Sequence, residues 1–199
     1  MKIDLTEIYK GLDEWRAERG ITAEGQKEGY IRNVMEELGE LAAGLRNYDS
    51  WSKCDLRFCQ IHKEMAERVI VDAICDIAVL TINAGADINC NEKLESINTT
   101  TQTTRCNSSL SFLLSECGNF DYYGKLSSYV CFNQILLSCA KLCEHYGFNF
   151  EIAMLETIKE ISSRTGSYDE KAKKWVKDTS DEAKAKWYQA NYELARIEK

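Results

Sequence analysis

Apolar residues recur every three or four positions along most of this chain, which is the spacing of one face of an α-helix. The first such segment spans residues 5–19 and ends at Gly20; its repeating apolar positions are Leu5, Ile8, Leu12 and Trp15. Further segments with this periodicity predict helices over residues 25–47, 64–86, 108–117, 126–146 and 149–163, and a last helix that begins near Ser180. The pattern predicts an all-α fold in a single domain over residues 1–199, with helices in its C-terminal part, 149–199.

The segments between these helices are expected to be connections. Residues 48–63 are a connector with aromatic side chains of its own, residues 96–105 are a polar, threonine-rich loop, and residues 118–124 are a turn. The chain contains no proline, which favours long uninterrupted helices over turn-rich β folds.

Composition narrows the class of protein. The net charge of −7 argues against a general nucleic-acid binder, which is usually basic. The longest apolar run, near residues 69–86, carries two aspartates and is not expected to span a membrane. Nine cysteines, most of them in apolar helical stretches, are expected to be reduced, buried thiols in a cytoplasmic protein.

The first candidate site lies in the helix over residues 25–47. On a helical wheel its apolar seam consists of Val34, Leu38, Leu41 and Leu45. Glu37 and Glu40 flank that seam as neighbours at i and i+3, where two like charges repel unless a cation lies between them. Taken alone, this acidic segment is more typical of a solvated helix face than of a site.

The second candidate site lies in the helix over residues 64–86, which is apolar almost all round and is therefore expected to be buried. Its polar residues share one stripe, formed by Arg68, Asp72, Asp76 and Asn83. Two buried aspartates one turn apart are costly unless they are paired or bind a metal ion. One interpretation is a pair neutralised by Arg68 and the backbone; the other is two facing helices whose carboxylates hold Mg²⁺ or Mn²⁺.

These two segments, EELGE and VDAICDIAVLTINA, resemble the MazG-type all-α nucleoside triphosphate pyrophosphohydrolases, which include dimeric dUTPases and dCTP pyrophosphatases. The family pattern is EExxE followed by ExxD on two antiparallel helices. Carried over, Glu37, Glu40 and Asp76 match metal ligands, while Ala73 stands where the family has an acid. Asp72, one turn before Asp76, is the expected substitute, as in the phage-encoded branch of the family.

The resemblance extends to the tail, over residues 156–169 and 173–178, where Arg164 and Lys174 become candidates for contacting a triphosphate. It implies a MazG-type helical bundle that hydrolyses (deoxy)nucleoside triphosphates to the monophosphate and pyrophosphate, with Mg²⁺ or Mn²⁺. Glu36 joins Glu37 as a catalytic acid, either behind the metal ligands or on an additional ion, and Asn83 and Arg68 join the substrate-binding residues. The family also implies a homodimer or homotetramer, in the bacterial host cytoplasm if the chain is phage-encoded.

Residues 105–146 resemble a degenerate copy of the acidic hairpin over residues 25–86. Of the acids, only Glu116 remains. If this is a repeat, it completes a four-helix core within one chain, with extra terminal helices. Phosphate-binding glycine loops and a Ser/His or Cys/His nucleophile pattern are missing, so P-loop, Rossmann and covalent chemistry are not expected. Two alternatives stay open: a dUTPase-like enzyme with strict base selection, and a non-catalytic helical interaction module.

Overall fold

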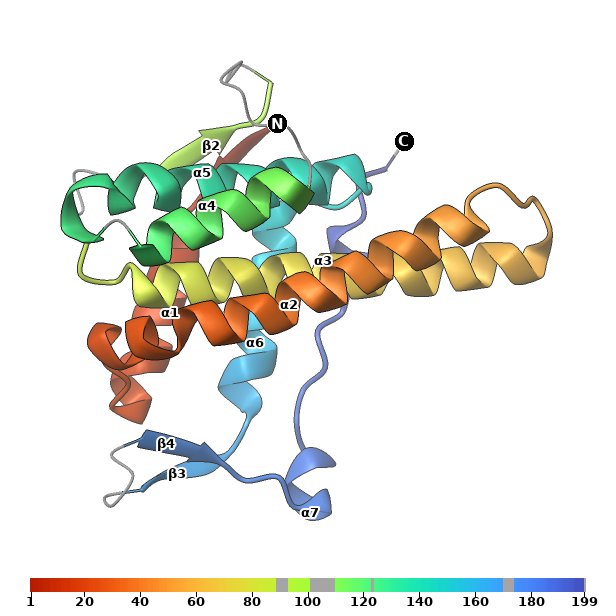
Figure 1. The fold of residues 1–199 in the computed structure, drawn as a ribbon. Coiled ribbons are helices and arrows are strands. Elements are labelled where there is room, and N and C mark those ends of the chain that lie inside the picture. Colours follow the sequence, from red (N-terminus) through yellow and green to blue (C-terminus); the bar gives the residue numbers. More distant parts are fainter. Residues whose placement is uncertain (89–92, 101–109, 123, 170–173, 199) are drawn as a thin grey trace.

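The computed structural model describes residues 1–199 except 89–92, 101–109, 123, 170–173 and 199, and its fold is all-α, as predicted (Figure 1). The main helices are α1 (Thr6–Arg19), α2 (Ala23–Trp51), α3 (Arg57–Ala84), α4 (Leu110–Tyr122), α5 (Gly124–His145) and α6 (Phe150–Ser163). The short helices are α7 (Asp181–Lys184) and the 3-10 helix η2 (Tyr192–Ala195). The strands β1 (Lys2–Asp4) and β2 (Ser96–Asn98), and β3 (Gly166–Asp169) and β4 (Lys174–Lys177), form two antiparallel pairs.

Two helical hairpins form the core of the molecule. Helices α2 and α3 lie antiparallel along their length, α4 and α5 form the second hairpin, and α4 packs on α2 while α5 packs on α3 (Figure 1). At Gly44 the two long helices approach so closely that a Cβ atom would lie 2.9 Å from Cγ1 of Ile70. Helices α1 and α6 pack on each other and on α3. The four-helix core with additional terminal helices therefore agrees with the predicted arrangement.

The predicted connector over residues 48–63 is wrong in its extent. Helix α2 continues to Trp51 and α3 begins at Arg57, so only residues 52–56 connect them. Aromatic contacts explain the longer helices: the ring of Trp51 stacks on His62, and Phe58 packs edge-on against both. The α2–α3 hairpin therefore extends well beyond the second hairpin (Figure 1).

The C-terminal part is less helical than predicted. After α6 the chain forms the β3–β4 hairpin, in which Gly166 pairs with Lys177 and Tyr168 with Trp175. Ser180 does cap the next helix, because its Oγ accepts a hydrogen bond from the N–H of Ala183, but that helix has only four residues. Residues 187–198, which we call the C-terminal strap, then run without further α-helix back along α6.

The cysteines also depart partly from expectation. Cys54 and Cys59 are joined by a disulfide at the connection between α2 and α3. Five others are free and buried, as predicted: Cys75, Cys117, Cys131, Cys139 and Cys143. Cys90 and Cys106 lie outside the described residues.

Among the described residues, none of the helices is both long enough and apolar enough to cross a membrane.

Candidate functional site

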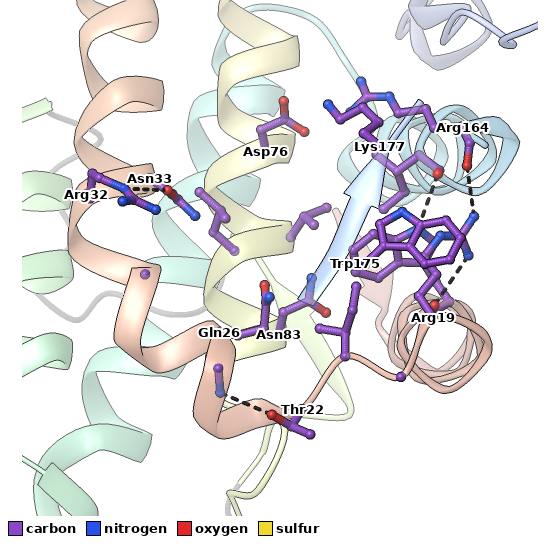
Figure 2. A pocket seen from close by; sticks show the side chains of 18 of the residues that line it. Arg19, Thr22, Gln26, Arg32, Asn33, Asp76, Asn83, Arg164, Trp175 and Lys177 are labelled. Atoms are coloured by element: carbon purple, nitrogen blue, oxygen red, sulfur yellow. Dashed lines mark hydrogen bonds between the residues drawn. The ribbon is translucent and has the colours of Figure 1, made fainter. Parts of the chain in front are cut away.

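A cleft of about 540 Å³ opens between the N-terminal half of α2, the C-terminal half of α3 and the β3–β4 hairpin (Figure 2). Glu37 of α2 and Asp76 of α3 line it, and Figure 2 shows Asp76 facing Arg164 and Lys177 across the cleft. Such a volume suits a small-molecule ligand such as a nucleotide. The cleft thus brings acidic and basic side chains together on opposite walls.

Four carboxylates, which we call the acid cluster, come from the two facing helices: Glu37, Glu40, Asp72 and Asp76. Burial, together with the neighbouring carboxylates of Glu40, Asp72 and Glu36, raises the pKa of Glu37 to about 7. Burial and the charges of Asp72 and Glu37 raise the pKa of Asp76 to about 8. The pKa of Asp72 is also raised by burial, and a hydrogen bond from Tyr192 opposes this rise. When they are ionised, the carboxylates of the acid cluster therefore repel one another.

The opposite wall concentrates positive charge. Burial and the neighbouring Arg164 guanidinium lower the pKa of Lys177, whereas the pKa values of Glu37, Asp72 and Asp76 are raised. Arg164 donates from NH2 to Glu160 Oε1 over 2.7 Å, while its buried Nε has no hydrogen-bond partner within the described structure. Arg164 is partly buried and has an unsatisfied donor, and the exposed Lys177 lies beside it, so the two cations favour an anion between them.

The end of the cleft away from the acid cluster is aromatic and polar. The Arg19 guanidinium, 7% exposed, lies 5.3 Å from the ring centre of Trp15 and 5.4 Å from that of Trp175. Asn83 is 1% exposed, and its Oδ1 accepts a hydrogen bond of 2.7 Å from Arg16 NH1. Because this oxygen is already bonded, the NH₂ group of Asn83 is what it can offer to a ligand.

The chemistry of the acid cluster suits Mg²⁺ or Mn²⁺, which bind carboxylate oxygens. No described ion pair neutralises Glu37, Asp72 or Asp76, so a cation would relieve their repulsion. At the same time, in the part of the chain that the structure describes, no three Asp, Glu, His or Cys side chains converge as a metal-binding group. The donor set therefore fits a divalent cation, and the side chains of Glu37, Glu40 and Asp76 would have to turn toward Asp72 to hold it.

The predicted site residues differ in how they lie relative to the cleft. Glu37, Asp76, Asn83 and Arg164 line the cleft, and Glu40 and Asp72 extend the acid cluster beyond it. Glu36 is exposed and acts on Glu37 only through its charge.

Arg68 does not join this site in the structure. Arg68 is 60% exposed and pairs with Glu193 at 3.2 Å. It does not line the cleft or neutralise the aspartates, so both roles predicted for it from the sequence are wrong. Lys174 is the first residue of β4, and its side chain lies outside the described part.

Several residues of the cleft were missed by sequence reasoning: Arg19, Gln26, Arg32, Trp175 and Lys177. A signal existed for Arg19, because it continues the apolar seam of α1 one turn beyond Trp15. A charged residue on the buried face of a helix is a candidate for a site. Trp175 and Lys177 could not be placed, because the strand that carries them was not predicted.

The second hairpin contributes no acid to the cluster within its described residues. Glu116 lies beside Cys131, whose pKa is raised by burial and then by the Glu116 charge. Residues 105–109 of this predicted repeat lie outside the described part. The observed role of the hairpin is packing against α2 and α3.

Comparisons with protein-family models, curated proteins and solved structures give no match, so the resemblance to the MazG-type enzymes is carried by the motifs alone.

Proposed function

We propose that the chain hydrolyses a (deoxy)nucleoside triphosphate to the monophosphate and pyrophosphate. The observation that carries this proposal is the separation of charge across one cleft, with Glu37 and Asp76 on one wall and Arg164 and Lys177 on the other. A site of this kind can take a cation against the acids and a polyanion against the bases. A triphosphate with its divalent cation meets both requirements.

Glu37, Glu40, Asp72 and Asp76 are proposed as the metal-binding residues. Bound there, Mg²⁺ or Mn²⁺ would offset the phosphate charge and lower the pKa of the attacking water. Glu37 lines the cleft and is also proposed as the group that accepts a proton from the attacking water. Glu36 is proposed to support Glu37 through its charge from the exposed side of α2.

The basic wall is proposed to hold the leaving pyrophosphate. Arg164 is fixed by Glu160, which leaves its unsatisfied Nε as a donor for a phosphate oxygen. Lys177 lies beside it on β4, so the two charges can act together on one leaving group. Lys174, three residues earlier in β4, stays a candidate for the same role.

The aromatic end of the cleft is proposed to receive the nucleoside. Trp15 and Trp175 supply ring surface, and the NH₂ group of Asn83 supplies a hydrogen-bond donor to sugar or base. This arrangement supports a nucleotide without naming the base, so a dUTPase-like enzyme with strict selection is the alternative within the same chemistry.

The test is a panel of the canonical dNTPs and NTPs plus dUTP, with Mg²⁺ and Mn²⁺ separately, run in ¹⁸O-labelled water. Attack on the α-phosphorus places ¹⁸O on the monophosphate and releases unlabelled pyrophosphate. Label in pyrophosphate, or orthophosphate released without a pyrophosphatase, contradicts the proposal. Turnover of dUTP alone would select the dUTPase-like alternative.

A protein with no turnover on any nucleotide, and no gain in melting temperature from either ion, would be an interaction module instead. The homodimer or homotetramer that the resemblance implies stays a prediction, and sedimentation equilibrium of the full chain tests it.

A further inference from the structure

The C-terminal strap is fixed to one polar face of α6. The N–H of Tyr188 donates to Ser163 Oγ over 2.8 Å, and the N–H of Ala190 donates to Glu160 Oε2 over 2.9 Å. The N–H of Asn191 donates to Glu156 Oε2 over 3.0 Å. The accepting residues on α6 lie one turn apart, so they bind the strap at regular intervals and set its register.

The far end of the strap is fixed as well. Arg196 NH1 donates to Glu67 Oε2 of α3 over 2.7 Å, and the N–H of Ile197 donates to the carbonyl of Gly147 over 2.8 Å. The short helix η2 is therefore held on both sides. Its first residue, Tyr192, is placed by contacts that do not involve the cleft.

Tyr192 reaches from this strap to the acid cluster. Its ring is buried in the core and the residue is 7% exposed. Its hydroxyl donates to Asp72 Oδ1 over 2.6 Å and lies 3.0 Å from Thr157 Oγ1 of α6. The other members of the acid cluster have no comparable described contact with a buried side-chain donor. Asp72 is the member of the cluster that replaces the acid expected at position 73, and it is the one that is fixed from outside.

We propose that Tyr192 is a positioning residue that orients Asp72 for metal binding, an inference that rests on the proposed function. By holding Oδ1, the phenol fixes the plane of the carboxylate and leaves Oδ2 for the ion. Because this hydrogen bond already restricts the side chain, Asp72 loses less conformational entropy when it binds the ion. Partners behind a metal ligand typically change metal affinity by about 10- to 100-fold.

The test is Mn²⁺ binding to the full chain without nucleotide, measured from the free Mn²⁺ signal in electron paramagnetic resonance. Tyr192→Phe removes only the hydroxyl, and we expect the Kd for Mn²⁺ to rise by about tenfold or more. We also expect kcat to recover toward the wild-type value at saturating Mn²⁺, because the ligand set is intact. In an Asp72→Asn background, Tyr192→Phe should cause no further rise.

Two matched variants control for a general loss of structure. Tyr188→Phe removes the same group from the same strap, but its hydroxyl donates to Glu156, outside the acid cluster. Thr157→Val removes the other neighbour of the Tyr192 hydroxyl and leaves the bond to Asp72. Both should keep the wild-type Kd for Mn²⁺, and thermal unfolding shows whether each variant is folded.

The outcomes separate this inference from the proposed function. If wild type binds Mn²⁺, Asp76→Asn abolishes binding and Tyr192→Phe keeps the wild-type Kd, then the role of Tyr192 is wrong and the metal site stands. An equal rise in Kd for Tyr188→Phe also overturns the role of Tyr192. If wild type binds no Mn²⁺, the metal site and the role of Tyr192 both fall.

Discussion

Asp76→Asn tests the acid cluster most directly, because its effect on stability without metal has the opposite sign from its effect on activity. Burial and the nearby acids raise the pKa of Asp76 to about 8 in the folded protein, against about 3.9 for an unperturbed aspartate. The folded state therefore binds this proton more tightly than the unfolded state. Ionisation of Asp76 reduces the free energy of unfolding as the pH rises from about 4 to about 8.

The magnitude follows from the same shift. The difference between about 8 and about 3.9 corresponds to at most about 5.5 kcal/mol above pH 8. Relaxation of the repulsion and the burial of the asparagine amide both reduce this value. We expect Asp76→Asn to stabilise the metal-free protein by about 1–3 kcal/mol at about pH 8.5, and by much less at about pH 5.

The assay is urea unfolding followed by circular dichroism, in EDTA, at both pH values, with Asp49→Asn as the control on the exposed side of the same hairpin. Mg²⁺ should then stabilise wild type and leave Asp76→Asn unchanged, and turnover of the variant should fall below about a tenth of the wild-type rate. The reasoning is refuted if Asp76→Asn is no more stable than wild type at the higher pH, or if the difference between them does not depend on pH.

Two further predictions concern the elements around the acid cluster. Glu116→Gln should leave kcat/KM within about twofold of wild type, because Glu116 lies beside Cys131 and not in the acid cluster; a large loss of rate in a folded variant would make the second hairpin a working half-site. Gly166→Ala should destabilise the protein by about 1–3 kcal/mol and raise the KM for nucleotide, because a Cβ there would collide with the carbonyl oxygen of Val176 and displace Trp175. Urea unfolding measures the stability of Gly166→Ala, and initial rates measure its KM, with Ser167→Ala as the control variant. An unchanged KM would show that the β3–β4 hairpin does not shape the cleft.

The helices could be predicted because their apolar seams are local. Positions three and four apart, such as Val34, Leu38 and Leu41, are all buried in the structure. The extent of α2 and α3 could not be predicted, because it depends on ring contacts between Trp51 and residues of the next helix. The β3–β4 hairpin was missed because its strands have four residues each, too short for a reliable alternation.

In the candidate site, too, the local pattern could be predicted and the long-range contacts could not. The helical wheel places Glu37 and Glu40 on one helix and Asp72 and Asp76 on the next, and the structure brings these acids within electrostatic reach of one another. Arg68 was misplaced because its partner, Glu193, is 125 positions away in the chain. Contacts of such separation depend on the tertiary fold, and a single sequence carries no signal for them.

The bond between Tyr192 and Asp72 joins residues 120 positions apart, and this separation has a consequence for the nascent chain. Both helical hairpins are translated before the strap, and during synthesis the earlier parts of a chain fold first. A ribosome-bound chain can therefore assemble its bundle while Asp72 still lacks its phenol partner. The acid cluster reaches its final form only after residue 192 has left the ribosome, so we expect stalled chains that are already helical to bind divalent ions more weakly than released ones.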